Sequence, residues 1–278
     1  MISTAAKAVA VVGVAGAIVA AGTSVAGAKA TGDQGPVRYS VSKHAVVHGA
    51  GHFRPGLVKI RVTGAKGHSL QIVKPRHGAG RYKLAADVNA FGQTGKANQL
   101  EHDFRLVGGA STGHSVFLTL RPGRYLFADS TPDSLTAKQI KVVHVSGRTS
   151  RASGYHSSGT IRAIHEMSWA KRPKSIPASG YLRFVNESTD SHFIVLARLK
   201  PGKTLSDVKK ALMGQENESD VLYSGARSNF DNGVISSHRS ETVSYDLHPG
   251  RYVMACFWPD ENGMPHAMMG MIRTIKLT

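Results

Sequence analysis

The side chains with the greatest capacity for chemistry lie in the second half of the chain. In chain order they are His192, Cys256, His266 and Met271. His192 follows Asn186 by six residues, and Cys256, the only cysteine, follows Tyr252 by four. Imidazole, thiol and thioether groups are all metal-binding side chains, and they differ in the metals that they favour.

This arrangement resembles the cupredoxin family, the plastocyanin and azurin type of small blue copper protein. In that family a His lies six residues after an Asn on one strand, a Cys lies four residues after a Tyr, and a His and a Met follow in the next loop. Carried over position by position, the resemblance implies four copper ligands: His192, Cys256, His266 and Met271. Copper that cycles between two oxidation states takes a thiolate and two imidazoles near one plane, with a weak thioether on the axis.

The loop after Cys256 departs from the family pattern. Nine residues separate Cys256 from His266, whereas the family has only a few. A loop of this length can close on a metal, because the entropy cost of closure grows slowly with length. It can equally fold so that His266 never meets Cys256, and Cys256 would then be a small buried hydrophobe in a core strand.

A second metal hypothesis uses the same loop differently. Five of the eight Met residues fall between Met254 and Met271, and Met264, His266 and Met268 form a tight group within that stretch. Soft thioether ligands favour Cu(I). On this alternative the chain is a Cu(I) carrier or scavenger, and these three residues are its ligands.

The second half has a weaker copy in the first half. The segment around Tyr125 matches the one around Tyr252, 127 residues later, with a shared Pro-Gly-Arg-Tyr sequence. His68 stands where His192 stands, but Asp129 stands where Cys256 stands, and residues 130–138 contain neither His nor Met. The repeat therefore predicts a tandem duplication in which the first copy has no copper and serves as a spacer or interaction module.

Short alternating runs separated by turn residues predict β-strands in both copies, as in Thr242–Leu247 before a His-Pro-Gly turn. One helix is predicted from about Leu205 to Met213, with Thr204 as its N-cap and Lys209 and Lys210 facing water. With the resemblance, these patterns predict an all-β chain of two tandem cupredoxin-like Greek-key β-sandwich domains, each with a short inserted helix.

The chain length of 278 residues fits two domains of ordinary size. Lys7, an apolar run and small residues up to Ala30 predict a signal peptide at 1–30. We then expect a degenerate cupredoxin-like domain at 36–146, a flexible basic linker at 147–159 and a cupredoxin-like domain at 160–278. The mature chain is expected to be secreted or held in the cell envelope, without a transmembrane span.

The composition and the net charge exclude some classes of protein and favour others. A single cysteine excludes a disulfide-stapled scaffold, and no arrangement of residues supports catalysis, so we expect a protein that is not an enzyme. The formal charge of +17 favours anionic partners, and for an exported chain an anionic cell-wall polymer is a more available partner than nucleic acid. Three functions remain: an electron carrier with a redox partner, a Cu(I) carrier or scavenger, and a metal-free binding or structural module of the cell envelope.

Overall fold

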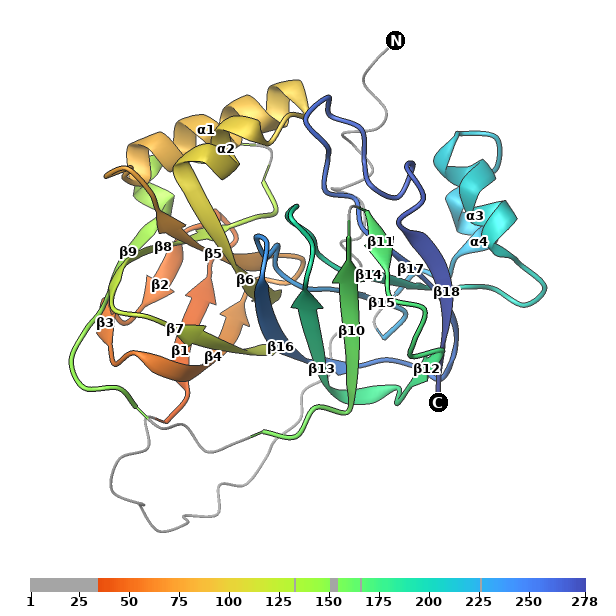
Figure 1. Ribbon diagram of the computed structural model, residues 1–278, viewed down its shortest axis with the longest axis horizontal. Coiled ribbons are helices and arrows are strands. Elements are labelled where there is room, and N and C mark those ends of the chain that lie inside the picture. Colours follow the sequence, from red (N-terminus) through yellow and green to blue (C-terminus); the bar gives the residue numbers. More distant parts are fainter. Residues whose placement is uncertain (1–34, 133, 151–154, 166, 226) are drawn as a thin grey trace.

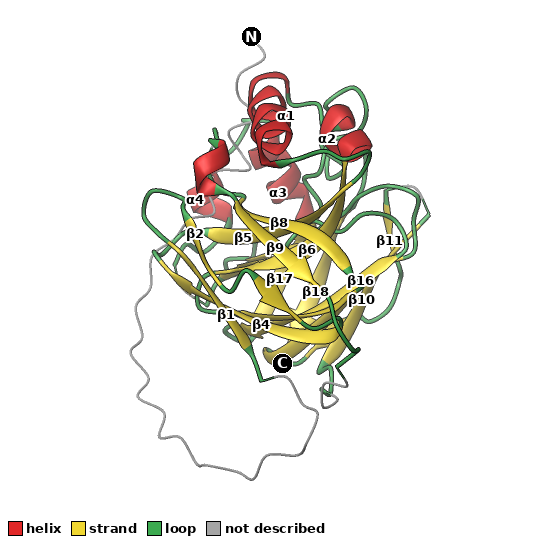
Figure 2. Cartoon of the chain, turned by 90° about the vertical axis from the view of Figure 1, so that its left-hand side faces the viewer, coloured by secondary structure: helices red, strands yellow, loops and turns green. Residues whose placement is uncertain are grey.

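The computed structural model describes residues 35–132, 134–150, 155–165, 167–225 and 227–278. The predicted signal peptide at 1–30 lies outside these residues, and so do residues 151–154 of the predicted linker. Strands dominate the described chain, and the helices gather at one end of it (Figures 1 and 2).

The first half contains nine strands, two α-helices and a short 3-10 helix among its described residues. In chain order they are β1 (Val37–Val41), β2 (Val47–Gly49), β3 (His52–Phe53), β4 (Gly56–Gly64), β5 (Ser69–Pro75), α1 (Arg81–Thr94), α2 (Asn98–Asp103), β6 (Phe104–Ser111), β7 (Ser115–Leu120), β8 (Gly123–Asp129), η2 (Ala137–Gln139) and β9 (Lys141–Val145). The strands follow the alternation of the sequence: in β4, for example, Val58, Ile60 and Val62 are buried while their neighbours are not.

The second half repeats this order of elements. It contains β10 (Gly159–Ile164), β11 (Ser168–Trp169), β12 (Ser175–Ile176), β13 (Ser179–Asn186), β14 (Val195–Arg198), α3 (Leu205–Leu212), α4 (Glu218–Val221), β15 (Asn229–Asp231), β16 (Arg239–Asp246), β17 (Gly250–Ala255) and β18 (Ile272–Leu277). Each half thus holds two α-helices, so the expectation of one short helix per domain is wrong in this detail. The first helix, α1, is also much longer than the sequence suggested, because Leu84, Val88 and Phe91 share one face of it and pack against the core.

Each half has a five-stranded sheet with the same strand order, β3-β9-β8-β5-β6 in the first and β12-β18-β17-β14-β15 in the second. The facing sheet is continuous across both halves, in the order β11-β10-β13-β16-β7-β4-β1-β2 (Figure 1). The fold is therefore a pair of β-sandwiches that share one eight-stranded layer. Strands β7 and β16, which occupy equivalent places in the two halves, pair antiparallel at the centre of this layer.

The two halves pack closely where they meet. One hydrophobic core cluster extends through both of them. Glu241 on β16 accepts a hydrogen bond from the backbone N–H of Gly109 on β6 at 2.8 Å. A Cβ at Gly233 of the second half would lie 2.1 Å from the backbone nitrogen of Gly109, and one at Gly108 would collide with the side chain of Glu241, so this approach of the two halves requires glycine.

Two local predictions are confirmed. Thr204 caps α3, and its side chain accepts a hydrogen bond from the backbone N–H of Asp207. Val208 is buried in a small cluster on the outer side of the β14-β17-β18 sheet, whereas Lys209 and Lys210 are exposed. The matching tyrosines also behave alike: Tyr125 donates to the carbonyl of Arg121, and Tyr252 donates to the carbonyl four residues before it.

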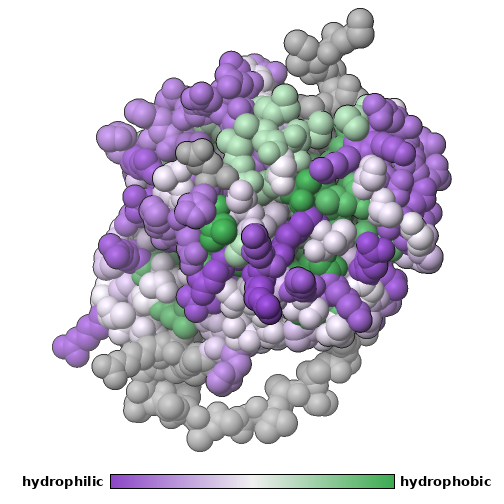
Figure 3. Space-filling view, turned by 45° about the vertical axis from the view of Figure 1, so that its right-hand side comes forward, coloured by the Kyte–Doolittle hydropathy of each residue, from purple (hydrophilic) through white to green (hydrophobic). Residues whose placement is uncertain are grey.

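The molecular surface is mixed in character. Much of the face in Figure 3 is hydrophilic, with apolar patches between the polar groups. Within the described residues, no helix combines the length and the hydrophobicity needed to cross a membrane.

Candidate metal centre

His192 is held in place by the loop that precedes it. Asn186, the last residue of β13, donates to the carbonyl oxygens of Asp190 and Ile235 at 2.7 and 3.1 Å. Its own side-chain oxygen accepts from the backbone N–H and the hydroxyl of Ser188. His192 then exchanges backbone hydrogen bonds with Ile235. The six-residue spacing thus has a local cause, because Asn186 closes the turn that delivers His192 to the core.

Cys256 follows directly on β17 and is fully buried. Its backbone N–H donates to the carbonyl of Met271 at 3.2 Å, and its carbonyl accepts from Ala267 at 2.7 Å. The indole N–H of Trp169 donates to the same Met271 carbonyl at 3.0 Å. Cys256 is therefore fixed from both sides, by its strand and by the returning chain.

The long loop after Cys256 doubles back on itself. The backbone N–H of His266 donates to the carbonyl of Trp258 at 2.9 Å, and Pro259 and Pro265 form an isolated bridge. At the tip, the Asp260 side chain accepts from the backbone N–H of Met264 at 2.7 Å. The extra residues form a closed excursion, so His266 returns to a position close to Cys256 despite the length of the loop.

The first half of the chain supports both ligand-bearing segments. Trp258 donates its indole N–H to the carboxylate of Glu101 on α2 at 3.1 Å, and its ring lies 5.4 Å from that of Phe91 on α1. Glu101 also bonds to the side chain of Ser191, the residue before His192. One carboxylate of the first half therefore bridges the segment of His192 and the segment of Cys256.

Three potential ligands converge at one point. The Nδ1 atoms of His192 and His266 are 3.0 Å apart, and they lie 3.6 and 3.7 Å from Sγ of Cys256. All three side chains are at most 1% exposed. Among the described residues, this is the one group of three or more His, Cys, Asp or Glu side chains close enough to hold a metal ion.

Burial controls the protonation of this cluster. It lowers the pKa of His192 to about 3, with a further contribution from His266, and it lowers the pKa of His266 as well. It raises the pKa of Cys256 to about 12, against the opposing effect of hydrogen bonds from the backbone of Phe193 and Trp258. At neutral pH both imidazoles are therefore neutral and offer a lone pair, whereas the thiol must lose a proton to bind a metal.

The spacing of the three atoms fits a metal ion. Bonds of about 2.0 Å to nitrogen and about 2.3 Å to sulfur separate neighbouring ligand atoms by roughly 3 to 4 Å, which is the range seen here. Nδ1 of each histidine faces the other two ligand atoms, whereas Nε2 of His192 is buried without a hydrogen-bond partner among the described residues. Two imidazoles and one thiolate are the trigonal set that copper favours.

The methionines divide into two groups. Met271 is fully buried, and its backbone is bonded to Cys256 and His266. Met264 and Met268 are 49% and 45% exposed. The ring of His266 faces Cys256 through Nδ1.

The equivalent positions of the first half hold a different pair. Nδ1 of His68 lies 2.5 Å from the carboxylate of Asp129, and Asp129 is 1% exposed. A carboxylate thus stands in place of the thiol, and it is paired with the histidine that corresponds to His192.

The residues that position the site were not predicted from the sequence. Trp258, Glu101 and Trp169 orient the ligand-bearing segments, but Glu101 is more than 150 residues from Trp258 along the chain. No local pattern marks such a contact. The one available signal was Trp258 itself, a large aromatic residue two positions after Cys256.

Comparison with known proteins gives structural neighbours only. The chain is similar to reduced auracyanin from Roseiflexus castenholzii, at 20% identity and a TM-score of 0.30, over 45% of this chain and 99% of that one. It is similar to plastocyanin from Dryopteris crassirhizoma, at 18% identity and a TM-score of 0.20, over 43% of this chain and 99% of that one.

A copper-containing nitrite reductase from Thermus scotoductus aligns over 87% of this chain and 61% of that one, at 10% identity and a TM-score of 0.25. No protein-family model matches the sequence, and no curated protein matches it. Support for copper comes from the cluster of His192, Cys256 and His266 itself.

Proposed function

We propose that the chain is an extracytoplasmic copper protein that transfers electrons through a site in its second half. His192, Cys256 and His266 would hold the metal, and Met271 would supply the weak fourth contact. Copper bound there would accept and release one electron. The observation that carries this proposal is the convergence of two Nδ1 atoms and one Sγ atom within 3.7 Å of one another.

The protein's own part is to hold these ligands still. Asn186 fixes the loop before His192, and the hydrogen bond between Trp258 and His266 closes the loop after Cys256. A site that keeps one geometry in both oxidation states exchanges electrons with little movement. The backbone N–H groups of Phe193 and Trp258 bond to the Cys256 sulfur. These bonds would also adjust the reduction potential of copper bound at the site.

A titration of the purified protein with Cu(II), followed by visible spectroscopy, tests this proposal. We expect strong visible absorption, because a thiolate bound to Cu(II) gives an intense band. Cys256→Ser should remove the band and leave the far-UV circular dichroism unchanged. As a matched control, replacing Met264 and Met268 together with Leu should keep the band.

The Cu(I) alternative predicts the opposite pattern. Cys256→Ser would still bind Cu(I) under reducing conditions, and the double replacement of Met264 and Met268 would abolish binding. Uptake of neither oxidation state by the wild-type chain would reject both copper functions and favour the metal-free structural module.

The remaining expectations form part of the same proposal. We infer that the two halves arose by duplication, since their sheets have the same strand order. The first copy would then have lost its site and become the support of the second. We also propose that the segment at 1–30 directs export and that the chain has a redox partner or an anionic cell-wall polymer as its binding partner. An anionic partner fits the charge of +17.

A further inference from the structure

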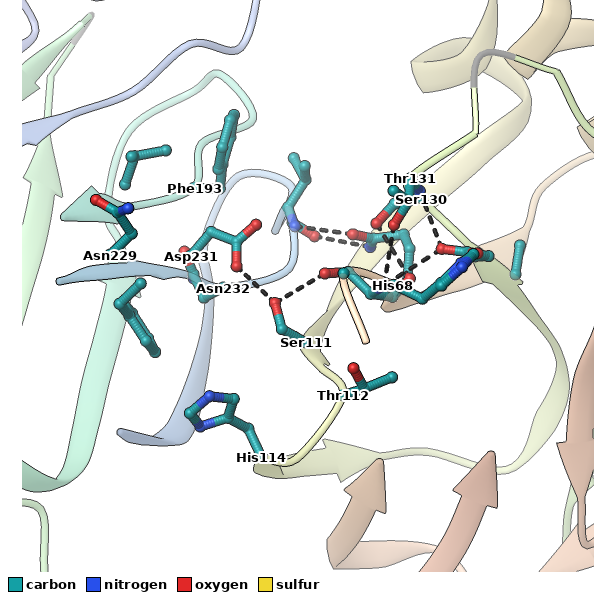
Figure 4. Close-up of a pocket in the computed structure, with 18 of the residues that line it drawn as sticks. His68, Ser111, Thr112, His114, Ser130, Thr131, Phe193, Asn229, Asp231 and Asn232 are labelled. Carbon is teal, nitrogen blue, oxygen red and sulfur yellow. Dashed lines mark hydrogen bonds and ion pairs between the residues drawn. The ribbon is translucent and has the colours of Figure 1, made fainter. Parts of the chain in front are cut away.

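A cavity of about 520 Å³ lies where the two halves meet. The first half contributes residues of α1, β5, β6 and β8, and the second contributes residues of β14 and β15 (Figure 4). The cavity is separate from the metal centre, because its lining includes Phe193 and Phe257 but not the neighbouring His192 and Cys256. Its size is that of pockets that hold small organic molecules.

A chain of hydroxyl groups leads to a carboxylate in the cavity wall. Ser111 on β6 donates to Oδ1 of Asp231 on β15 at 2.5 Å, across the boundary between the halves. The hydroxyl of Ser69 lies 2.8 Å from that of Ser111. Because Ser111 uses its proton on Asp231, Ser69 donates to Ser111. The second carboxylate oxygen of Asp231 points into the cavity (Figure 4).

His114 lies on the same side of the cavity as Asp231 (Figure 4). Its Nδ1 lies 2.7 Å from the carbonyl oxygen of Ser244. A carbonyl can only accept, so Nδ1 carries a proton. The ring meets that of Phe230 edge to face, with 6.3 Å between their centroids.

Most other polar groups of the wall are already bonded within the protein. Asn232 accepts from the backbone of Ile194 and donates to Glu241, both at 2.5 Å. Two pairs of wall residues bond to each other, namely His68 with Asp129 and Arg227 with Asp246. Lys66 is exposed. In the part of the chain that the structure describes, Asp231 forms no ion pair with a Lys or Arg side chain, and His114 is the basic residue that acts on its carboxylate.

The rest of the wall is largely apolar. Its members include Leu84, Val88, Phe91, Leu106, Phe193 and Phe257. A carboxylate in such surroundings is costly unless a cation pairs with it. The raised pKa of Asp231, which results from burial, reflects that cost.

We propose that this cavity binds a small primary amine with an apolar body. The ammonium group would donate to the second carboxylate oxygen of Asp231, and the body would pack against the aromatic wall. The group that faces this end of the cavity is the carboxylate of Asp231, so the complementary ligand is a cationic donor. The proposal does not depend on the metal centre.

Three probes of similar shape test the charge preference on the wild-type chain. They are 2-phenylethylamine, 2-phenylethanol and 3-phenylpropanoate, and binding is measured by calorimetry and by the fluorescence of Trp258, which lines the cavity. We expect the amine to bind with a Kd of about 1 mM or tighter. The alcohol should bind about tenfold more weakly or worse, a difference of 1.4 kcal/mol, and the anion should not bind.

One variant assigns the effect to Asp231. Asp231→Asn keeps the acceptor for Ser111 and should reduce the affinity for the amine to that of the alcohol. Asp220→Asn, which makes the same change of charge at an exposed position, should leave the affinity unchanged.

Three results would overturn the proposal: equal affinity for the amine and the alcohol, no binding of the amine at several times 1 mM, or full affinity in Asp231→Asn. The probe series uses the wild-type chain, so it decides the question even if that variant fails to fold.

Discussion

Replacing Glu101 with Leu should weaken a metal site to which the first half contributes no ligand. Glu101 accepts from the indole of Trp258 at 3.1 Å and bonds to Ser191, and both of these residues are at least 93% buried. A buried donor that loses its partner costs about 1–3 kcal/mol. Because two donors lose their partner and the surrounding side chains relax in part, we expect the free energy of unfolding to fall by roughly 3 kcal/mol.

Chemical denaturation of the metal-free protein measures this loss. The matched control is Glu187→Leu, which removes a surface ion pair with Arg162 and should cost at most about 1 kcal/mol. In the copper titration, Glu101→Leu should bind copper more weakly, because the segments of His192 and Cys256 lose their common support. If Glu101→Leu is no less stable than Glu187→Leu, the first half does not brace the site.

Three further outcomes are expected. Asn186→Leu removes four hydrogen bonds around the loop before His192, so the denaturation midpoint should fall by an amount equivalent to about 4 kcal/mol; an unchanged midpoint would reject the role given to Asn186. Burial raises the pKa of Glu241 from 4.5 to about 8, so the folded state retains a proton that the unfolded chain releases. Stability should therefore fall as the pH rises through this window, by at most about 1.4 kcal/mol per pH unit for this group. Glu241→Gln should lack that part of the slope, and parallel pH profiles of the two proteins would contradict this. Leu212→Asp on the inner face of α3 should lower the melting temperature, whereas Lys209→Ala should leave it within error; equal shifts would show that α3 does not pack as described.

The sequence predicted the parts of this protein that depend on local patterns. Alternation located most strands, and the Thr204 and Asp207 pair located the start of α3. The spacing from Asn186 to His192 pointed to a ligand only through the family resemblance, and the four hydrogen bonds by which Asn186 closes this turn were not predicted.

The path of the loop after Cys256 could not be predicted in this way. It depends on the bridge between Pro259 and Pro265 and on the contact of Trp258 with α2. The shared layer was equally hidden, because the pairing of β7 with β16 joins residues more than 120 positions apart. Such contacts are decided by the packing of the two halves and leave no periodic trace in either segment.

The eight-stranded layer also bears on aggregation. In a half expressed alone, β7 or β16 would become an exposed edge with unpaired backbone N–H and C=O groups, which is a template for pairing with another chain. The outer edges of the intact layer are β2 and β11, of only three and two residues, and short edge strands offer little to pair with. We therefore expect an isolated half to self-associate through its exposed strand, with the partner copy in the place that the other half now occupies. In this protein, the covalent link between the copies would keep that edge permanently satisfied.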